Sequence, residues 1–253
     1  MGELLGEERQ GLPIMFHMMN EERLFVATQS LGQASSAYQL AIAYARERLQ
    51  GRHLSQGKNP EAPPVPIIQH PDVRRMLLWM KSVTEGLRGL NYFTGHCIDL
   101  AEITEGDEKK LWTGMVEILT PIVKAYGSDQ AWDVCEQAIQ VLGGYGFCSE
   151  YLVEQCARDV KIASLYEGTN GIQAMDLLGR KIPMAGGKVF EALMSRLEPA
   201  ITAGKSSALL KPYAESLERA RAELVKAVKH VAGQAGSKEF LTAFLKATPL
   251  PVS

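Results

Sequence analysis

Glu167 is the single carboxylate in the segment SLYEGTNGIQ (164–173). It follows the apolar approach IASLY and precedes a turn rich in glycine, after which TNGIQAMDLLGRKI (169–182) has the pattern of a helix. Asn170 and Gln173 have the spacing of a capping box at its start. A carboxylate that apolar side chains shield from water could act as a general base, whereas an isolated surface glutamate would simply be solvated.

The composition excludes several classes of protein. The 253 residues are 46% hydrophobic and carry a net charge of −2, so they can form a sizeable core and show no basic excess for nucleic acid. Charged residues interrupt every long apolar run, which argues against a membrane span. The four cysteines and five histidines lack the spacing of metal ligands, so we expect no metal site and a cytoplasmic protein with reduced cysteines.

Most of the chain has helical periodicity. Apolar residues recur every three or four positions from Pro13 to about Gly51, and after the Gly- and Pro-rich loop 51–66 a second long helix is expected at 71–103. A third is expected from about Asp107, with a kink or division at Gly127–Ser128. Shorter helices follow.

This order of elements predicts an all-α fold, an antiparallel helical bundle with an appended helical segment. The expected domains are an N-terminal remnant of a preceding domain, a helical bundle, and an additional, incomplete helical segment. Their predicted bounds are 1–13, 14–183 and 184–253.

Three stretches taken together carry a family resemblance. VLGGYGFCSEYLVEQCARDVKI, LYEGTNGIQ and, upstream, AYARERLQGR resemble the C-terminal half of the acyl-CoA dehydrogenases. MFHMMNEERLFVATQSLG and IIQHPDVRRMLLWMKSVTEGLR are similar to the subgroup with an extra C-terminal helical region. The resemblance implies that Glu167 is the catalytic base: it removes a proton beside the thioester carbonyl of an acyl-CoA, FAD accepts a hydride from the next carbon, and the product is a trans-2-enoyl-CoA.

The resemblance also implies residues that contact the cofactor. Thr169 matches a residue near the flavin, and Gly171 stands where the family has a glutamine, so only backbone could make that contact here. Arg48 matches an arginine that reaches the FAD diphosphate across a dimer interface, which suits a guanidinium fork. The alternatives are a helix cap for Thr169 and a solvated charge, or a partner of Tyr44 one helical turn away, for Arg48.

Four further residues have roles implied in the same way. Gln140, Gly143 and Gly144 match a segment beside the adenine end of the neighbouring subunit's FAD, and Arg23 matches an arginine near the CoA part of the pocket. The alternatives are a surface helix residue for Gln140, a plain helix end for the two glycines and a surface salt bridge for Arg23.

The resemblance implies that residues 1–13 are the remnant of a preceding β-domain and that residues 14–183 are the helical bundle with the FAD-contacting and catalytic residues. It also implies partners for this chain. A complete enzyme of this family has an N-terminal helical domain and a β-domain, forms a homodimer or tetramer, and passes electrons to electron-transferring flavoprotein. We therefore expect the isolated chain to be inactive. Two other functions stay open: a fragment of an acyl-CoA oxidase, and a non-catalytic helical module that serves in assembly.

Overall fold

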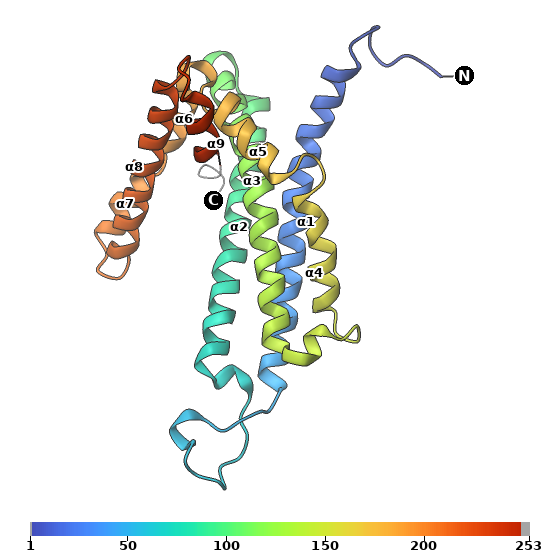
Figure 1. Cartoon of the computed structure of the whole chain (residues 1–253), viewed down its shortest axis with the longest axis vertical. Coiled ribbons are helices and arrows are strands. Elements are labelled where there is room, and N and C mark those ends of the chain that lie inside the picture. Colours follow the sequence, from blue (N-terminus) through green and yellow to red (C-terminus); the bar gives the residue numbers. More distant parts are fainter. Residues whose placement is uncertain (1, 249–253) are drawn as a thin grey trace. The chain divides into compact units, whose positions relative to one another are not determined.

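The computed structural model describes residues 2–248, apart from the side chain of His17, and within that range its regular structure is helical (Figure 1). Leu49 and Pro66 form an isolated β-bridge that closes the loop between the first two long helices. The α-helices are α1 (Gly11–Glu47), α2 (Pro71–Ile103), α3 (Gly106–Leu142), α4 (Val153–Lys161), α5 (Asn170–Asp176), α6 (Lys188–Ser195), α7 (Glu198–Lys205), α8 (Lys211–Gly233) and α9 (Phe240–Ala247). The predicted all-α class is confirmed.

The chain divides into two compact units that do not follow the order of the sequence. Unit 1 comprises the residues up to Phe93 together with Tyr126–Glu167, and unit 2 comprises Thr94–Ala125 together with the residues from Gly168 onward. The long helices α2 and α3 each contribute one part to each unit. The domain bounds inferred from the sequence, with a division after residue 183, stay a prediction.

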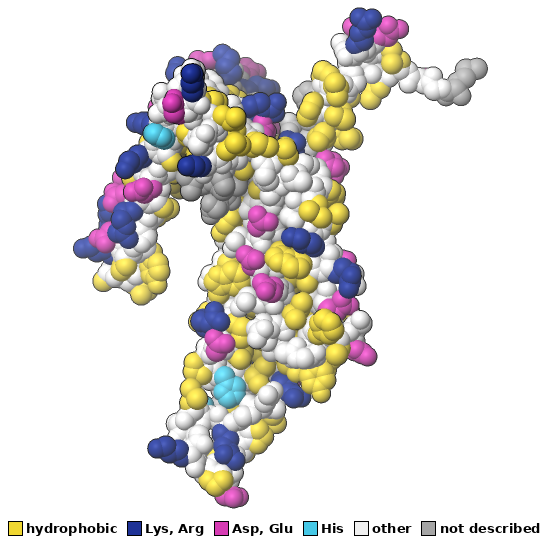
Figure 2. All heavy atoms as spheres, in the orientation of Figure 1, with side chains coloured by type: hydrophobic (Ala, Val, Ile, Leu, Met, Phe, Trp, Pro, Cys, Tyr) yellow, Lys and Arg dark blue, Asp and Glu magenta, His cyan; other side chains and the backbone are white. Residues whose placement is uncertain are grey.

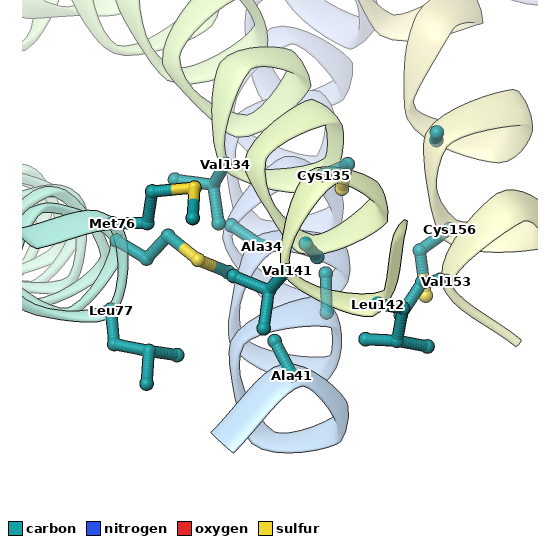
Figure 3. Packing of buried hydrophobic residues seen from close by; sticks show 14 of the residues in the cluster. Ala34, Ala41, Met76, Leu77, Val134, Cys135, Val141, Leu142, Val153 and Cys156 are labelled. Atoms are coloured by element: carbon teal, nitrogen blue, oxygen red, sulfur yellow. The ribbon is translucent and has the colours of Figure 1, made fainter. Parts of the chain in front are cut away.

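Unit 1 is held together by a core between four helices. α1 contributes small residues to this core, α2 contributes two methionines and a leucine, and α3 and α4 contribute valines, alanines and cysteines (Figure 3). The fully buried alanines of α1, Ala34, Ala37, Ala41 and Ala45, allow its neighbours to approach closely. Each fully buried Val, Leu or Met side chain contributes roughly 1.5–3 kcal/mol to the stability of such a core.

The second unit contains the helices that the sequence places after Pro183. α7 and α8 pack against each other so tightly that a Cβ added to Gly204 would lie 2.8 Å from the Cβ of Ala214. Ion pairs of 2.6 Å join Lys205 to Glu218 and Arg221 to Glu198 along this hairpin. These two helices are therefore joined both by close packing of small residues and by ion pairs.

One expectation about the helices is wrong. α3 runs without interruption through Gly127 and Ser128, so the expected division at that point is wrong, while the alternative of a kink stays a prediction. Gly127 instead faces Ala27 of α1, where an added Cβ would lie 3.8 Å from the alanine Cβ. A glycine in a helix can mark a close helix contact as well as a bend.

Candidate active site

The backbone at Glu167 is held in an unusual conformation. Glu167 has φ 55° and Gly168 has φ 84°, so two consecutive residues lie in the left-handed region. Glycine adopts this region without penalty, but for a glutamate it costs on the order of 1 kcal/mol or more and requires support from the surrounding structure. A short 3-10 helix, Ile162–Ser164, leads into the turn, and α5 begins two residues after it.

Thr169 caps α5. Its Oγ1 accepts a hydrogen bond from the backbone N–H of Ile172 at 3.4 Å, which gives the first turn one of the acceptors that it lacks. The capping box expected from Asn170 and Gln173 is therefore wrong by one residue, since Asn170 is already inside the helix. Thr169 is exposed, and its predicted contact with flavin stays a prediction.

Arg23 of α1 supports the turn from within unit 1. The arginine is only 7% exposed, and its Nε donates a hydrogen bond to the carbonyl oxygen of Glu167 at 3.2 Å. Its structural role is thus to hold the backbone of the proposed base, and a contact with the CoA part of a substrate stays a prediction. The alternative of a surface salt bridge is excluded by its burial.

Tyr166, next to Glu167, is fixed to the same helix. Its hydroxyl donates a hydrogen bond to the Oε1 atom of Gln29. Burial, and then the negative charges of Glu167 and Glu22, raise the pKa of Tyr166 above its ordinary value. The phenol therefore stays neutral and able to donate at physiological pH, and the half-buried Glu167 has a fixed neighbour on its N-terminal side.

Arg48 lies among three tyrosines at the end of α1. Its guanidinium carbon is 5.3 Å from the centre of the Tyr145 ring, and Tyr145 and Tyr151 are themselves 5.3 Å apart. The Nε atom of Arg48 is buried and has no hydrogen-bond partner within residues 2–248. A buried donor without a partner costs roughly 1–3 kcal/mol, so the guanidinium is suited to receive an acceptor such as a phosphate oxygen.

The segment GGYGF forms a 3-10 helix, Gly143–Phe147, directly after α3. Gln140, Gly143 and Gly144 are all exposed, and Gly143 ends α3 with φ 62°. Gly146, which the sequence did not single out, is the glycine that packing requires: an added Cβ would lie 2.5 Å from the carbonyl oxygen of Ile139. Gly171 is exposed on α5, and no described atom outside its own helix lies within 4 Å of a Cβ built there.

Lys124 is a second residue that sequence reasoning missed. It lies on α3 in the part that belongs to unit 2, is 0% exposed, and is the largest of the fully buried side chains in the described chain. Its Nζ donates to the carbonyl oxygen of Gly168 at 2.7 Å and to Oδ1 of Asn170 at 3.0 Å. The turn after Glu167 is thus bound by a buried ammonium group.

The remaining features of the described chain concern metal ligands, membrane spans and cavities. No group of three potential metal ligands is present among residues 2–248, and no helix in this range is long and apolar enough to cross a membrane.

A cavity of about 1170 Å³ lies in unit 2, lined by side chains of α6, α8 and α9 such as Phe190, Val228 and Phe244. None of the site residues inferred from the sequence lines it.

Comparisons with known proteins give the family. The family model "Acyl-CoA dehydrogenase, C-terminal domain" matches residues 9–182. A 3-methylmercaptopropionyl-CoA dehydrogenase of Ruegeria pomeroyi is 42% identical over 238 residues, which are 93% of this chain and 40% of that protein. This chain therefore spans about 40% of the length of this relative.

Solved structures agree with this result. Butyryl-CoA dehydrogenase from Megasphaera elsdenii matches 69% of this chain and 39% of its own, with 31% identity and a TM-score of 0.55. The Caenorhabditis elegans protein ACDH-11 matches 99% of this chain and 42% of its own, with a TM-score of 0.78 at 21% identity, and so shares the fold. The matched family domain, with the helices and the YEGT turn described above, shows that the chain belongs to the acyl-CoA dehydrogenase family.

Proposed function

We propose that this chain is the catalytic and FAD-contacting C-terminal part of an acyl-CoA dehydrogenase, with Glu167 as the base. The observation that carries the proposal is the left-handed backbone at Glu167, held by a buried arginine at 3.2 Å. Strained backbone of this kind is found at functional sites, where geometry matters more than stability. The family membership gives the reaction class, α,β-dehydrogenation of an acyl-CoA thioester.

The role of Glu167 follows from the weakness of the carbon acid. A proton next to a thioester carbonyl leaves only when a base is held against it, so the carboxylate must be positioned before the substrate arrives. The turn restricts the backbone of Glu167, and Tyr166 and Arg23 fix its surroundings in unit 1. FAD, when bound, accepts the hydride from the neighbouring carbon.

Arg48 is the residue of this chain that fits a cofactor phosphate best. Its buried Nε lacks a partner in the described structure, and the tyrosine ring beside it holds the guanidinium plane in place. We propose that it contacts the FAD diphosphate of a neighbouring protomer, with Gln140, Gly143 and Gly144 close to the adenine end. Thr169 and the backbone of Gly171 would lie near the flavin, and Arg23 would border the CoA part of the pocket.

Exposed apolar side chains support the proposal that further domains pack on this chain. Large hydrophobic residues gather around the first turns of α1 (Figure 2), among them Leu12 at 66%, Phe16 at 46% and Met18 at 57% exposed. Contiguous apolar surface of this kind indicates an interface. We assign it to the N-terminal and β-domains of the complete enzyme, and we expect a homodimer or tetramer that delivers electrons to electron-transferring flavoprotein in the cytoplasm.

A chimera tests the proposal. The chain is joined to the part of the Ruegeria pomeroyi relative that it does not cover, and the purified protein is assayed for bound FAD and for reduction of an artificial electron acceptor by acyl-CoA. We expect a yellow, active protein, whereas the chain alone binds no FAD and turns nothing over. A chimera that binds FAD without turnover would support a non-catalytic module, and one that consumes oxygen at the rate of substrate oxidation would support an oxidase.

A further inference from the structure

We propose that Lys124 is a positioning residue for the base: its buried ammonium group holds the Gly168–Thr169 peptide, one residue beyond Glu167. The inference rests on the proposed function, because it gives Lys124 a part in the work of Glu167. It adds a residue of α3. No side chain of this helix was expected beside Glu167 from the sequence. The contacts that support it all lie within unit 2.

The burial of Lys124 requires an explanation. Lysine is rarely fully buried, and moving an ammonium group out of water costs several kcal/mol unless acceptors replace the water. Its neighbours on α3, Val123 and Ala125, are buried and apolar. A leucine or methionine would fill the same volume without this cost, so a lysine here indicates a use for its donors.

The donors of Lys124 are directed at the turn. The bonds of 2.7 Å to the carbonyl oxygen of Gly168 and of 3.0 Å to Oδ1 of Asn170 reach residues on both sides of Thr169. An ammonium group carries three donors, so one side chain can bind several acceptors of a tight turn at once. Hydrogen bonds from a charged donor are also about twice as strong as neutral ones.

Two further hydrogen bonds fix the same turn. Asn170 donates through Nδ2 to the carbonyl oxygen of Ala125 at 3.2 Å. Two neighbouring residues of α3 therefore bind Asn170, Lys124 as a hydrogen-bond donor and Ala125 as an acceptor. Gln173, which is 0% exposed, donates through Nε2 to the carbonyl oxygen of Gly168 at 3.3 Å. This network determines the orientation of the Gly168 peptide, which a flexible glycine alone would leave free.

The orientation of the Gly168–Thr169 peptide restricts the direction of Glu167, one residue before it. Only the φ and ψ angles of Gly168 separate this peptide from the one that joins Glu167 to Gly168, and both residues have positive φ, so a rotation at Gly168 would move the Cα–Cβ bond of Glu167. A displacement of about 1 Å in a catalytic group can lower a rate about 10²-fold. Lys124 therefore contributes to the rate by restricting the turn, through the backbone.

The variant Lys124→Met tests this role, with Lys181→Met as its matched control. Methionine has nearly the same length and no charge, and the carbonyl oxygen of Gly168 keeps its hydrogen bond from Gln173, so we expect the variant to fold with a loss of stability of about 1–3 kcal/mol for the acceptor left unpaired. Lys181 is also a partly buried lysine of unit 2, but it pairs with Glu117. Both variants are made in the full chain for hydrogen exchange and in the active chimera for kinetics.

The expected result is specific to the turn. In Lys124→Met the amides of residues 166–172 exchange about tenfold faster or more, while those of α8 are unchanged. In the chimera kcat falls by about 10- to 100-fold and KM for acyl-CoA changes less than threefold, because the substrate still binds but meets a poorly placed base. Lys181→Met leaves kcat and the exchange at the turn as they are.

Two results would overturn the inference. One is a normal kcat in Lys124→Met, and the other is a loss of activity that comes with faster exchange throughout α3, which would give Lys124 a structural role only. A parallel Glu167→Gln variant separates the two proposals. If Glu167→Gln is inactive and Lys124→Met is normal, only the positioning role fails, whereas an active Glu167→Gln enzyme removes the proposed function itself.

Discussion

Gly146 offers the sharpest test of the packing around the proposed cofactor segment. In Gly146→Ala the new Cβ would lie 2.5 Å from the carbonyl oxygen and 2.9 Å from the Cα of Ile139. Carbon and oxygen atoms normally approach to about 3.3 Å, so the shortfall is about 0.8 Å. The opposing atoms belong to the backbone of α3 and cannot rotate away, so the segment Gly143–Phe147 itself must shift.

The cost follows from the geometry of the clash. Overpacking of this kind costs about 1–3 kcal/mol, and each kcal/mol lowers Tm by about 2–4 °C in a chain of this size, so we expect Tm to fall by about 2–12 °C. The matched control is Gly144→Ala, because no described atom outside its neighbours lies within 4 Å of a Cβ built on Gly144, and its φ is not positive. Gly143→Ala is intermediate, at about 1–2 kcal/mol, because Gly143 has φ 62°.

Thermal unfolding followed by circular dichroism measures this order. We expect Gly144→Ala to melt at or above the temperature of the unchanged chain, since an alanine at a compatible φ restricts the unfolded state. In Gly146→Ala the ring signals of Tyr145 also shift in NMR spectra, because this residue moves with the segment and carries the contact with Arg48. Equal melting temperatures for Gly146→Ala and Gly144→Ala would refute the close approach to α3.

Three further predictions concern single side chains. Only the exposed Cys148 should react with a thiol reagent in the native chain, because the other cysteines are buried, and burial, and then neighbouring Cys156, raise the pKa of the Cys135 thiol to about 12. We expect one equivalent of label on the unchanged chain and none on Cys148→Ser, and labelling of Cys135 before unfolding would contradict this. Thr169→Ala should destabilise the first turn of α5 by about 1 kcal/mol and speed amide exchange there, with Thr169→Ser close to normal. Arg48→Gln should weaken FAD binding by the chimera by about 10- to 100-fold, because loss of a charged hydrogen bond costs about 1.5–3 kcal/mol. Equal FAD affinity of the unchanged chimera and its Arg48→Gln variant would remove Arg48 from the cofactor site.

The helices could be predicted because their signals are local. Periodic apolar residues gave the long helices, and the Gly- and Pro-rich stretch 51–66 gave the loop between the first two of them. The turn at Glu167 was recognised from the order of its motif. Its left-handed backbone could not be deduced, because nothing in a single glutamate indicates a positive φ.

The supporting residues could not be found from local patterns alone. A lysine in a helix is normally solvated, so Lys124 attracted no attention, although it is spaced by seven residues from Ala131 and then from Ala138 along the buried side of α3. That spacing was the available signal. The contact of Arg48 with Tyr145 joins segments that are distant in sequence, and the contact of Gly146 with Ile139 depends on how the short 3-10 helix folds back on α3, so no periodicity encodes either of them.

Exchange of the substrate's α-proton with solvent tests the central claim most directly, because it reports proton removal by the base separately from electron transfer. In the active chimera, exchange from acyl-CoA into deuterium oxide is measured for Glu167→Gln and for a control, Glu150→Gln, in which an exposed glutamate is changed. We expect exchange to fall by about 10²–10⁴-fold in Glu167→Gln and to be unchanged in the control. Undiminished exchange in Glu167→Gln would show that another group removes the proton.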